Sequence, residues 1–277
     1  MLLPAAILIF LTFYAGLVWT VYVSFTRSGI VPNYTWSGLV QYQRLFADER
    51  WMTAYPNMFV FGAVLIGGAL VFGTVLAIVI DQNVKAEGLF RAVFLYPLSV
   101  SFIVSGLAWQ WLLNPTLGLQ ASVQALGYPE FTFDWIARAD RSIYTVAIGA
   151  IWHSSGLVMA IMLAGMRNID AEIWRATRVD GIPRYRVYLS IIIPMLRPMV
   201  LTCVILLVGS VIRAYDLVVA MTQGGPGFAS DLPAKFVVDS IFERGNLGLG
   251  SAGAVIMLVS MTIAVAPYFY IEMRRRA

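Results

Sequence analysis

Charged residues are scarce in this sequence. Asp, Glu, Lys and Arg make up 12% of its 277 residues, against roughly 25% in soluble domains. The apolar residues come in long blocks of about 20 residues, the length that a helix needs to cross a bilayer core about 30 Å thick. Short segments of alternating hydrophobicity, which would indicate a membrane β-barrel, are missing. We therefore predict an all-α, multi-spanning membrane protein.

Cysteine, histidine and lysine are also rare. Cys203 has no second cysteine to pair with, and neither it nor the single His153 has neighbours that would complete a metal or nucleophile site. Lys85 and Lys235 do not follow glycines, so the Gly-Lys-Ser/Thr of a phosphate-binding loop is absent. The chain is therefore predicted to be no enzyme and to hold no cofactor or metal of its own.

The start of the chain has no charged n-region and no cleavage site of small residues. We expect the first apolar block to be a retained anchor, and its abrupt start suggests that a short cytoplasmic tail precedes Met1. The net charge of +4 is not taken as a sign of nucleic-acid binding, because the placement of the cations follows membrane topology.

Six apolar blocks are long enough to span a membrane. They cover residues 2–25, 54–80, 92–113, 143–166, 191–211 and 251–271. Lys and Arg favour the cytoplasmic side of a membrane. One set of loops is dense in them: Lys85, Arg91, Arg167, Arg175, Arg178, Arg184, Arg186, Arg274, Arg275 and Arg276. The opposite, longer set is sparser: Arg27, Arg44, Arg50, Arg138, Arg141, Lys235 and Arg244. Both termini are therefore predicted to be cytoplasmic.

The loop between the fourth and fifth spans is the longest and most basic on the cytoplasmic side. Asp170 suits a helix N-cap and Glu172 the first turn, while Gly181 and Pro183 form a stop signal. On a helical wheel Ile173, Trp174, Ala176 and Thr177 share one face, flanked by Arg175 and Arg178. Such a helix could dock in a groove of a cytoplasmic partner or lie on the membrane surface, and the residues alone leave both readings open.

This segment resembles the EAA loop of binding-protein-dependent ABC permeases, whose pattern is Glu-Ala-Ala, three residues, Gly, nine residues, Ile-x-Leu-Pro. Here Arg175-Ala176-Thr177 is followed at the same spacing by Gly181 and by Ile191-Ile192-Ile193-Pro194. Thr177 and Ile193 are conservative replacements. Arg175 is not, because it stands in place of the glutamate, so that glutamate's contact with the ATPase cannot be carried over.

Other runs resemble carbohydrate permeases of the maltose and α-glucoside type. They are Leu95-Tyr96-Pro97, Val179-Asp180-Gly181 and the stretch 214–227, which begins Ala214-Tyr215-Asp216. The resemblance implies a type I importer permease fold over residues 1–277 as a single domain, with a coupling loop at about residues 167–194. The residues implied to couple to the ATPase are Trp174, Arg175, Ala176, Thr177, Arg178, Asp180 and Gly181.

The resemblance also implies the partners and the location. These are a second permease chain, two ATP-binding subunits that hold ATP and Mg, an extracytoplasmic sugar-binding protein and the lipid of the bacterial inner membrane. The implied function is half of a sugar pathway that works by alternating access.

Several polar or aromatic residues in or near the spans are candidates for the substrate pathway: Trp109, His153, Arg213, Tyr215 and Asp216. Arg213 and Asp216 lie about one helical turn apart, and they could equally form an internal ion pair. His153 and Trp109 could equally be packing residues.

Two other functions compete with sugar import. An ABC permease for a polyamine or glycerol phosphate would share the coupling loop. An ion-coupled carrier would need carboxylates within its spans, and apart from Asp81 and Asp216 at span edges these are nearly absent.

Overall fold

The computed structural model describes residues 7–82 and 84–276, the last ten of them as helix backbone only. Four unbroken helices are long and apolar enough to cross a membrane: Ile7–Ser24, which ends in α2 (Ala15–Ser24), α4 (Glu49–Asp81), α8 (Ser142–Arg167), and Leu247–Ala266 within α15 (Leu247–Arg276). Two bent helix pairs make up to six spans. The predicted membrane class is confirmed, and the six predicted segments agree with the count in which each bent pair is one span; residues 2–6 of the first segment lie outside the described part of the chain.

The third predicted span is not a straight helix. It is a pair, Glu87–Ser99, which begins with α5 (Glu87–Leu95), and α6 (Phe102–Leu112), bent by 103°. Pro97 opens a short 3-10 turn, Val100 is extended, and the Ser101 hydroxyl accepts a hydrogen bond from the Val104 amide at 3.3 Å. A new helix N-cap inside the apolar block therefore redirects the chain.

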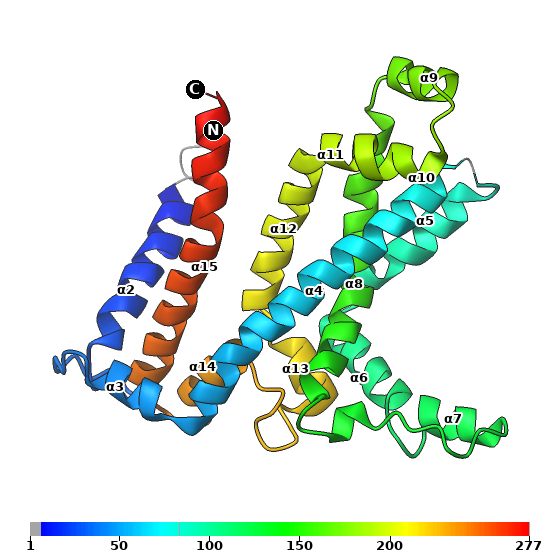
Figure 1. Ribbon diagram of the computed structural model, residues 1–277. Helices are drawn as coiled ribbons and strands as arrows, with labels where there is room; N and C mark the ends of the chain where they lie inside the picture. The colour runs from blue at the N-terminus through cyan, green and yellow to red at the C-terminus, as the bar shows by residue number, and fades with distance from the viewer. Residues whose placement is uncertain (1–6, 83, 277) are drawn as a thin grey trace.

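The fifth predicted span is also bent. Arg184–Met195, which contains α10 (Arg184–Arg186) and α11 (Ile193–Met195), meets α12 (Arg197–Ile212) at 69°. Pro198 in the first turn of α12 requires a helix start there, because proline has no amide hydrogen for the preceding turn. Only α12 runs lengthwise beside α4, while 184–195 crosses the end of the bundle (Figure 1).

The central packing is that of α4 against α8. An added Cβ at Gly73 would lie 2.6 Å from Val158 Cβ, and one at Gly68 would lie 2.4 Å from Ile151 Cδ1. The absence of these side chains lets the two helices approach closely, as small residues do in membrane bundles. The buried side chains of α4 and α8 form the main apolar core.

Four helices occur where only loops were expected. They are α3 (Val40–Ala47), α7 (Leu119–Ala125), α13 (Asp216–Thr222) and α14 (Pro233–Phe242). All four lie at one end of the bundle (Figure 1). The opposite end carries α9 (Ala171–Val179), the beginning of the first described helix and the end of α15. This arrangement agrees with a topology in which α9 and both ends of the chain share one side of the membrane.

Candidate translocation cavity and coupling helix

The helix α9 is formed by the local signals that its sequence predicts. The Asp170 carboxylate accepts a hydrogen bond from the Glu172 amide at 2.9 Å. Gly181 has a φ of +65°, and the Gly181 and Ile182 amides donate to the carbonyls of Arg178 and Thr177. These two bonds form a Schellman motif, which suits glycine because it has no Cβ to clash in the left-handed region.

The predicted coupling residues do not share one face of α9. Thr177 is buried and Trp174 is partly buried, with the Trp174 ring edge-on to Tyr188 at 5.7 Å. Both therefore face their own chain. Arg175, Ala176, Arg178 and Asp180 are exposed, so the surface open to a partner is formed by these residues.

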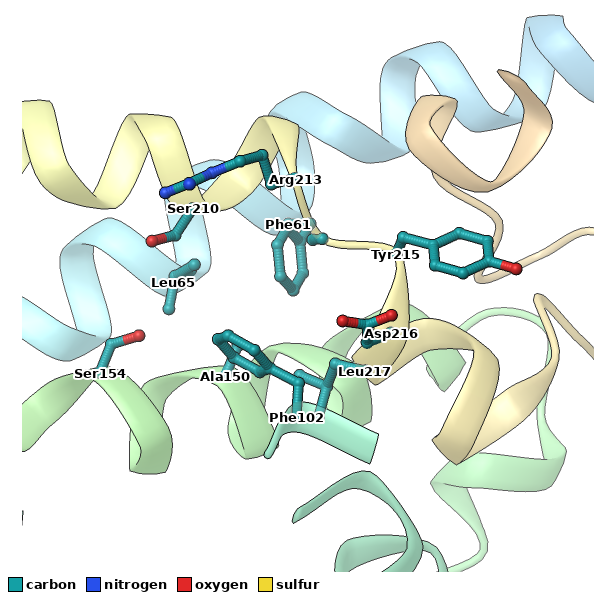
Figure 2. A pocket seen from close by; sticks show the side chains of 11 residues that line it. Phe61, Leu65, Phe102, Ala150, Ser154, Ser210, Arg213, Tyr215, Asp216 and Leu217 are labelled. Atoms are coloured by element: carbon teal, nitrogen blue, oxygen red, sulfur yellow. The ribbon is translucent and has the colours of Figure 1, made fainter. Parts of the chain in front are cut away.

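A cavity of about 290 Å³ lies where α12 ends and α13 begins. The chain leaves the helical path at Arg213, and the Tyr215 amide donates to the Arg213 carbonyl at 2.8 Å. Walls from α4, α6 and α8 complete the cavity, whose lining is Phe61, Leu65, Phe102, Ala150, Ser154, Ser210, Arg213, Ala214, Tyr215, Asp216 and Leu217. Figure 2 shows the Asp216 carboxylate directed toward the space between Phe61 and Phe102.

Arg213 and Asp216 do not pair with each other. Within the described part of the chain neither side chain makes a salt bridge within 4.0 Å, and Arg213 Nε donates instead to the Gly209 carbonyl at 3.2 Å. The internal ion pair considered for them is therefore not formed. The cavity offers a cationic donor, an anionic acceptor and the exposed ring of Phe102, while the Phe61 ring in its wall is buried.

The other predicted pathway residues lie further from the cavity space. Tyr215 lines the cavity but its side chain points away from Phe61 and Asp216 (Figure 2). His153 is buried behind Phe102, with ring centroids 4.0 Å apart. Trp109 is partly buried and packs edge-on to Trp152 with centroids 6.0 Å apart, outside the lining.

Phe61, Leu65 and Phe102 were not foreseen as cavity residues. They are apolar residues in apolar segments, and nothing in their local sequence distinguishes them from lipid-facing neighbours. A buried charge cluster at the N-terminal end of α4 was also missed. Arg50 forms ion pairs with both Asp231 and Asp239, and Lys235 Nζ donates to Asp239 at 2.6 Å.

Comparisons with known proteins agree with this architecture. Residues 69–277 match the model of the family described as binding-protein-dependent transport system inner membrane component. A probable ABC transporter permease protein of Pyrococcus horikoshii is 33% identical over 271 residues, covering 97% of this chain and 93% of that protein. The xylose/arabinose import permease protein XacH of Haloferax volcanii is 28% identical, covering 97% and 86%.

Among solved structures, a bacterial alginate ABC transporter in complex with an alginate pentasaccharide-bound periplasmic protein contains a similar chain. Its TM-score is 0.83 at 16% sequence identity, over 100% of this chain and 93% of that one. This likeness shows that the type I importer permease fold is shared. Taken together, the sequence match and the fold show that the chain belongs to the family of binding-protein-dependent ABC transporter permeases.

Proposed function

We propose that this chain is one of two permease subunits of an ATP-driven importer, and that it forms half of the route by which a sugar crosses the inner membrane. The cavity at the break between α12 and α13 carries the proposal. A pyranose ring has apolar C–H faces that suit Phe102, and hydroxyl groups that can donate to Asp216 and accept from Arg213. A site that combines aromatic faces with a few polar groups is typical of small-ligand recognition.

Two indications support the substrate class that we propose. The name of one relative refers to xylose and arabinose, which supports a sugar. The run Tyr215-Asp216-Leu217-Val218-Val219-Ala220 resembles the α-glucoside type. We therefore propose an α-glucoside or a related oligosaccharide as the substrate.

α9 is linked to the cavity wall through α8. α8 lines the cavity with Ala150 and Ser154 and continues unbroken to Arg167, only three residues before the Asp170 cap of α9. Because packed helices switch between discrete arrangements, a displacement of α9 is transmitted to the cavity wall. This linkage supports alternating access driven by two separate ATPase subunits, which would bind ATP and Mg²⁺ and contact the exposed residues of α9.

The proposal is tested by purifying the chain with the products of neighbouring genes and measuring ATPase activity in nanodiscs. We expect the extracytoplasmic binding protein, loaded with one α-glucoside from a panel that also contains pentoses and an alginate oligosaccharide, to stimulate hydrolysis. Stimulation by a pentose instead would correct the substrate and keep the importer. If no ATPase copurified and uptake followed a proton or sodium gradient, the importer itself would be wrong.

The coupling segment is tested in the same assay by Gly181→Asp. The change should abolish stimulation while the complex stays assembled, because it disturbs the end of α9. Gly38→Asp is the matched control, since Gly38 has a φ of +60° and, like Gly181, no heavy atom within 4 Å of an added Cβ. Equal loss in both variants would mean that the effect is a general loss of folding.

A further inference from the structure

A second cavity, of about 320 Å³, lies between α9 and the bundle, at the end of the molecule where α4 and the segment 184–195 meet. Its lining is Asp81, Gln82, Trp174, Thr177, Arg178, Ile182, Arg184, Val187 and Tyr188. Of the four exposed residues of α9 named above, Arg178 lines this cavity, whereas Arg175, Ala176 and Asp180 lie outside its lining.

The cavity has more positive than negative charge. Arg178 and Arg184 line it, and neither guanidinium pairs with a carboxylate in the part of the chain that the structure describes. Arg178 Nε donates only to the Trp174 carbonyl, at 3.2 Å. The single acidic residue of the lining, Asp81, accepts a hydrogen bond from the Tyr188 hydroxyl at 3.3 Å. The two guanidinium groups are therefore available to an anion, whereas the Asp81 carboxylate is engaged by the Tyr188 hydroxyl.

The surroundings of the arginines are those of a membrane surface. The segment 184–195 runs across the end of the bundle rather than along it (Figure 1). On this segment Tyr185 and Leu189, four residues apart, are 61% and 64% exposed. An exposed aromatic and an exposed aliphatic side chain beside arginines are typical of a segment at the level of lipid headgroups.

From these observations we infer that the cavity beneath α9 binds a phosphate group, and that its occupant is the headgroup of an anionic phospholipid of the cytoplasmic leaflet. Arginine guanidinium groups match phosphate oxygens in geometry and charge. Basic pockets between helices on the cytoplasmic side are suited to such headgroups. The acyl chains would lie along Tyr185 and Leu189, and the lipid would form part of the surface against which α9 packs. This inference goes beyond the proposed function and does not depend on the substrate.

The test is native mass spectrometry of the full chain in a neutral detergent, titrated with phosphatidylglycerol or with zwitterionic phosphatidylcholine. A neutral micelle has no surface potential, so retained lipid reports a site rather than general attraction. We expect phosphatidylglycerol to bind more tightly, and the double variant Arg178→Gln/Arg184→Gln to weaken its binding roughly thirtyfold. The matched control Arg175→Gln/Arg186→Gln removes the same charge from two neighbouring arginines outside the cavity lining and should change binding little.

Three outcomes would overturn the inference. Equal weakening in both double variants would mean general attraction to basic surface. Displacement of the lipid by millimolar inorganic phosphate would identify the occupant as a free anion rather than a headgroup. If the cavity variant kept the lipid but no longer copurified with an ATPase subunit, the two arginines would serve that protein contact instead.

Discussion

Two sites along α4 differ in how they hold charge. At its N-terminal end Arg50 is buried between Asp231 and Asp239, and Lys235 completes a cluster of two cations and two anions. The rings of Phe228 and Phe236 lie 5.3 and 5.7 Å from the Arg50 guanidinium carbon. At the cavity further along, Arg213 and Asp216 are exposed and unpaired within the described residues.

The difference separates a structural cluster from a binding site. A buried charge is tolerated only when it is paired and hydrogen-bonded, and the pairing leaves nothing free for a ligand. Burial alone would raise the pKa of Asp239, but the hydrogen bonds from Lys235 and Arg50 outweigh it and hold the pKa below its usual value. Burial raises the pKa of Asp231 despite its ion pair with Arg50, so the lowered pKa favours the charged form at Asp239 alone. The cluster fixes the loop before α14 to α4, which Asn57 also holds through the carbonyls of Ala229 and Asp231.

The largest effect is expected from Arg50→Met. It leaves two buried carboxylates with one cation, and breaking a buried ion pair costs about 3–5 kcal/mol of folding free energy. The measurement is thermal or denaturant unfolding of the purified chain in detergent. The double variant Arg50→Met/Asp231→Asn should recover part of the loss, because the remaining Asp239 stays paired with Lys235. A stability equal to that of the unchanged protein in the single variant would contradict the structural reading of the cluster.

The next effect is expected from Asp216→Asn, on transport rather than on stability. A charge-assisted hydrogen bond contributes about 1.5–3 kcal/mol, so sugar-stimulated transport should fall roughly tenfold to a hundredfold. The unfolding midpoint should not move, since Asp216 has no salt-bridge partner among the described residues. Glu130→Gln, at an exposed site outside the membrane spans, is the control. A loss of stability with unchanged transport would mean that Asp216 stabilises the fold and does not contact the substrate.

A smaller effect is expected at His153, and it should show whether this residue has a structural role or serves the substrate pathway directly. Its ring packs on Phe102, and Nδ1 has no hydrogen-bond partner among the described residues. If His153 positions Phe102 by ring contact, His153→Ala should lower transport about fivefold, in keeping with an aromatic contact of about 1 kcal/mol. His153→Phe should restore transport and His153→Gln should not. The reverse order would show that its polar atoms serve the pathway directly.

The sequence predicts some features of this molecule to the residue. The cap at Asp170 and the stop at Gly181 depend on contacts within four or five positions, so they are visible in local sequence. The number of apolar segments follows from hydropathy and bilayer thickness. The two bends are harder to predict, because Pro97 and Pro198 mark breaks without fixing the direction of the chain after them.

Long-range pairing explains what the sequence does not reveal. Arg50 lies about 180 residues from its carboxylate partners, and only the i,i+4 pair of Lys235 and Asp239 is a local signal of that cluster. Arg213, Tyr215 and Asp216 could be found as polar residues next to a span, but Phe61 and Phe102 become cavity residues only when α4 and α6 are brought beside α12. The face of α9 that looks outward is likewise decided by the packing of Trp174 on Tyr188.

The smallest effect is expected from Arg244→Gln, which tests whether burial or pairing gives the cluster its strength. Arg244 lies at the same end of the molecule as Arg50, and its guanidinium carbon is 5.7 Å from the Phe236 ring centroid, as is that of Arg50. It pairs with Asp48 at 3.2 Å, but its side chain is 40% exposed. Water solvates both partners after the change, so the unfolding free energy should fall by less than about 1 kcal/mol. A loss as large as that of Arg50→Met would show that the aromatic contact with Phe236, rather than desolvation of the carboxylates, holds this end of α4 in place.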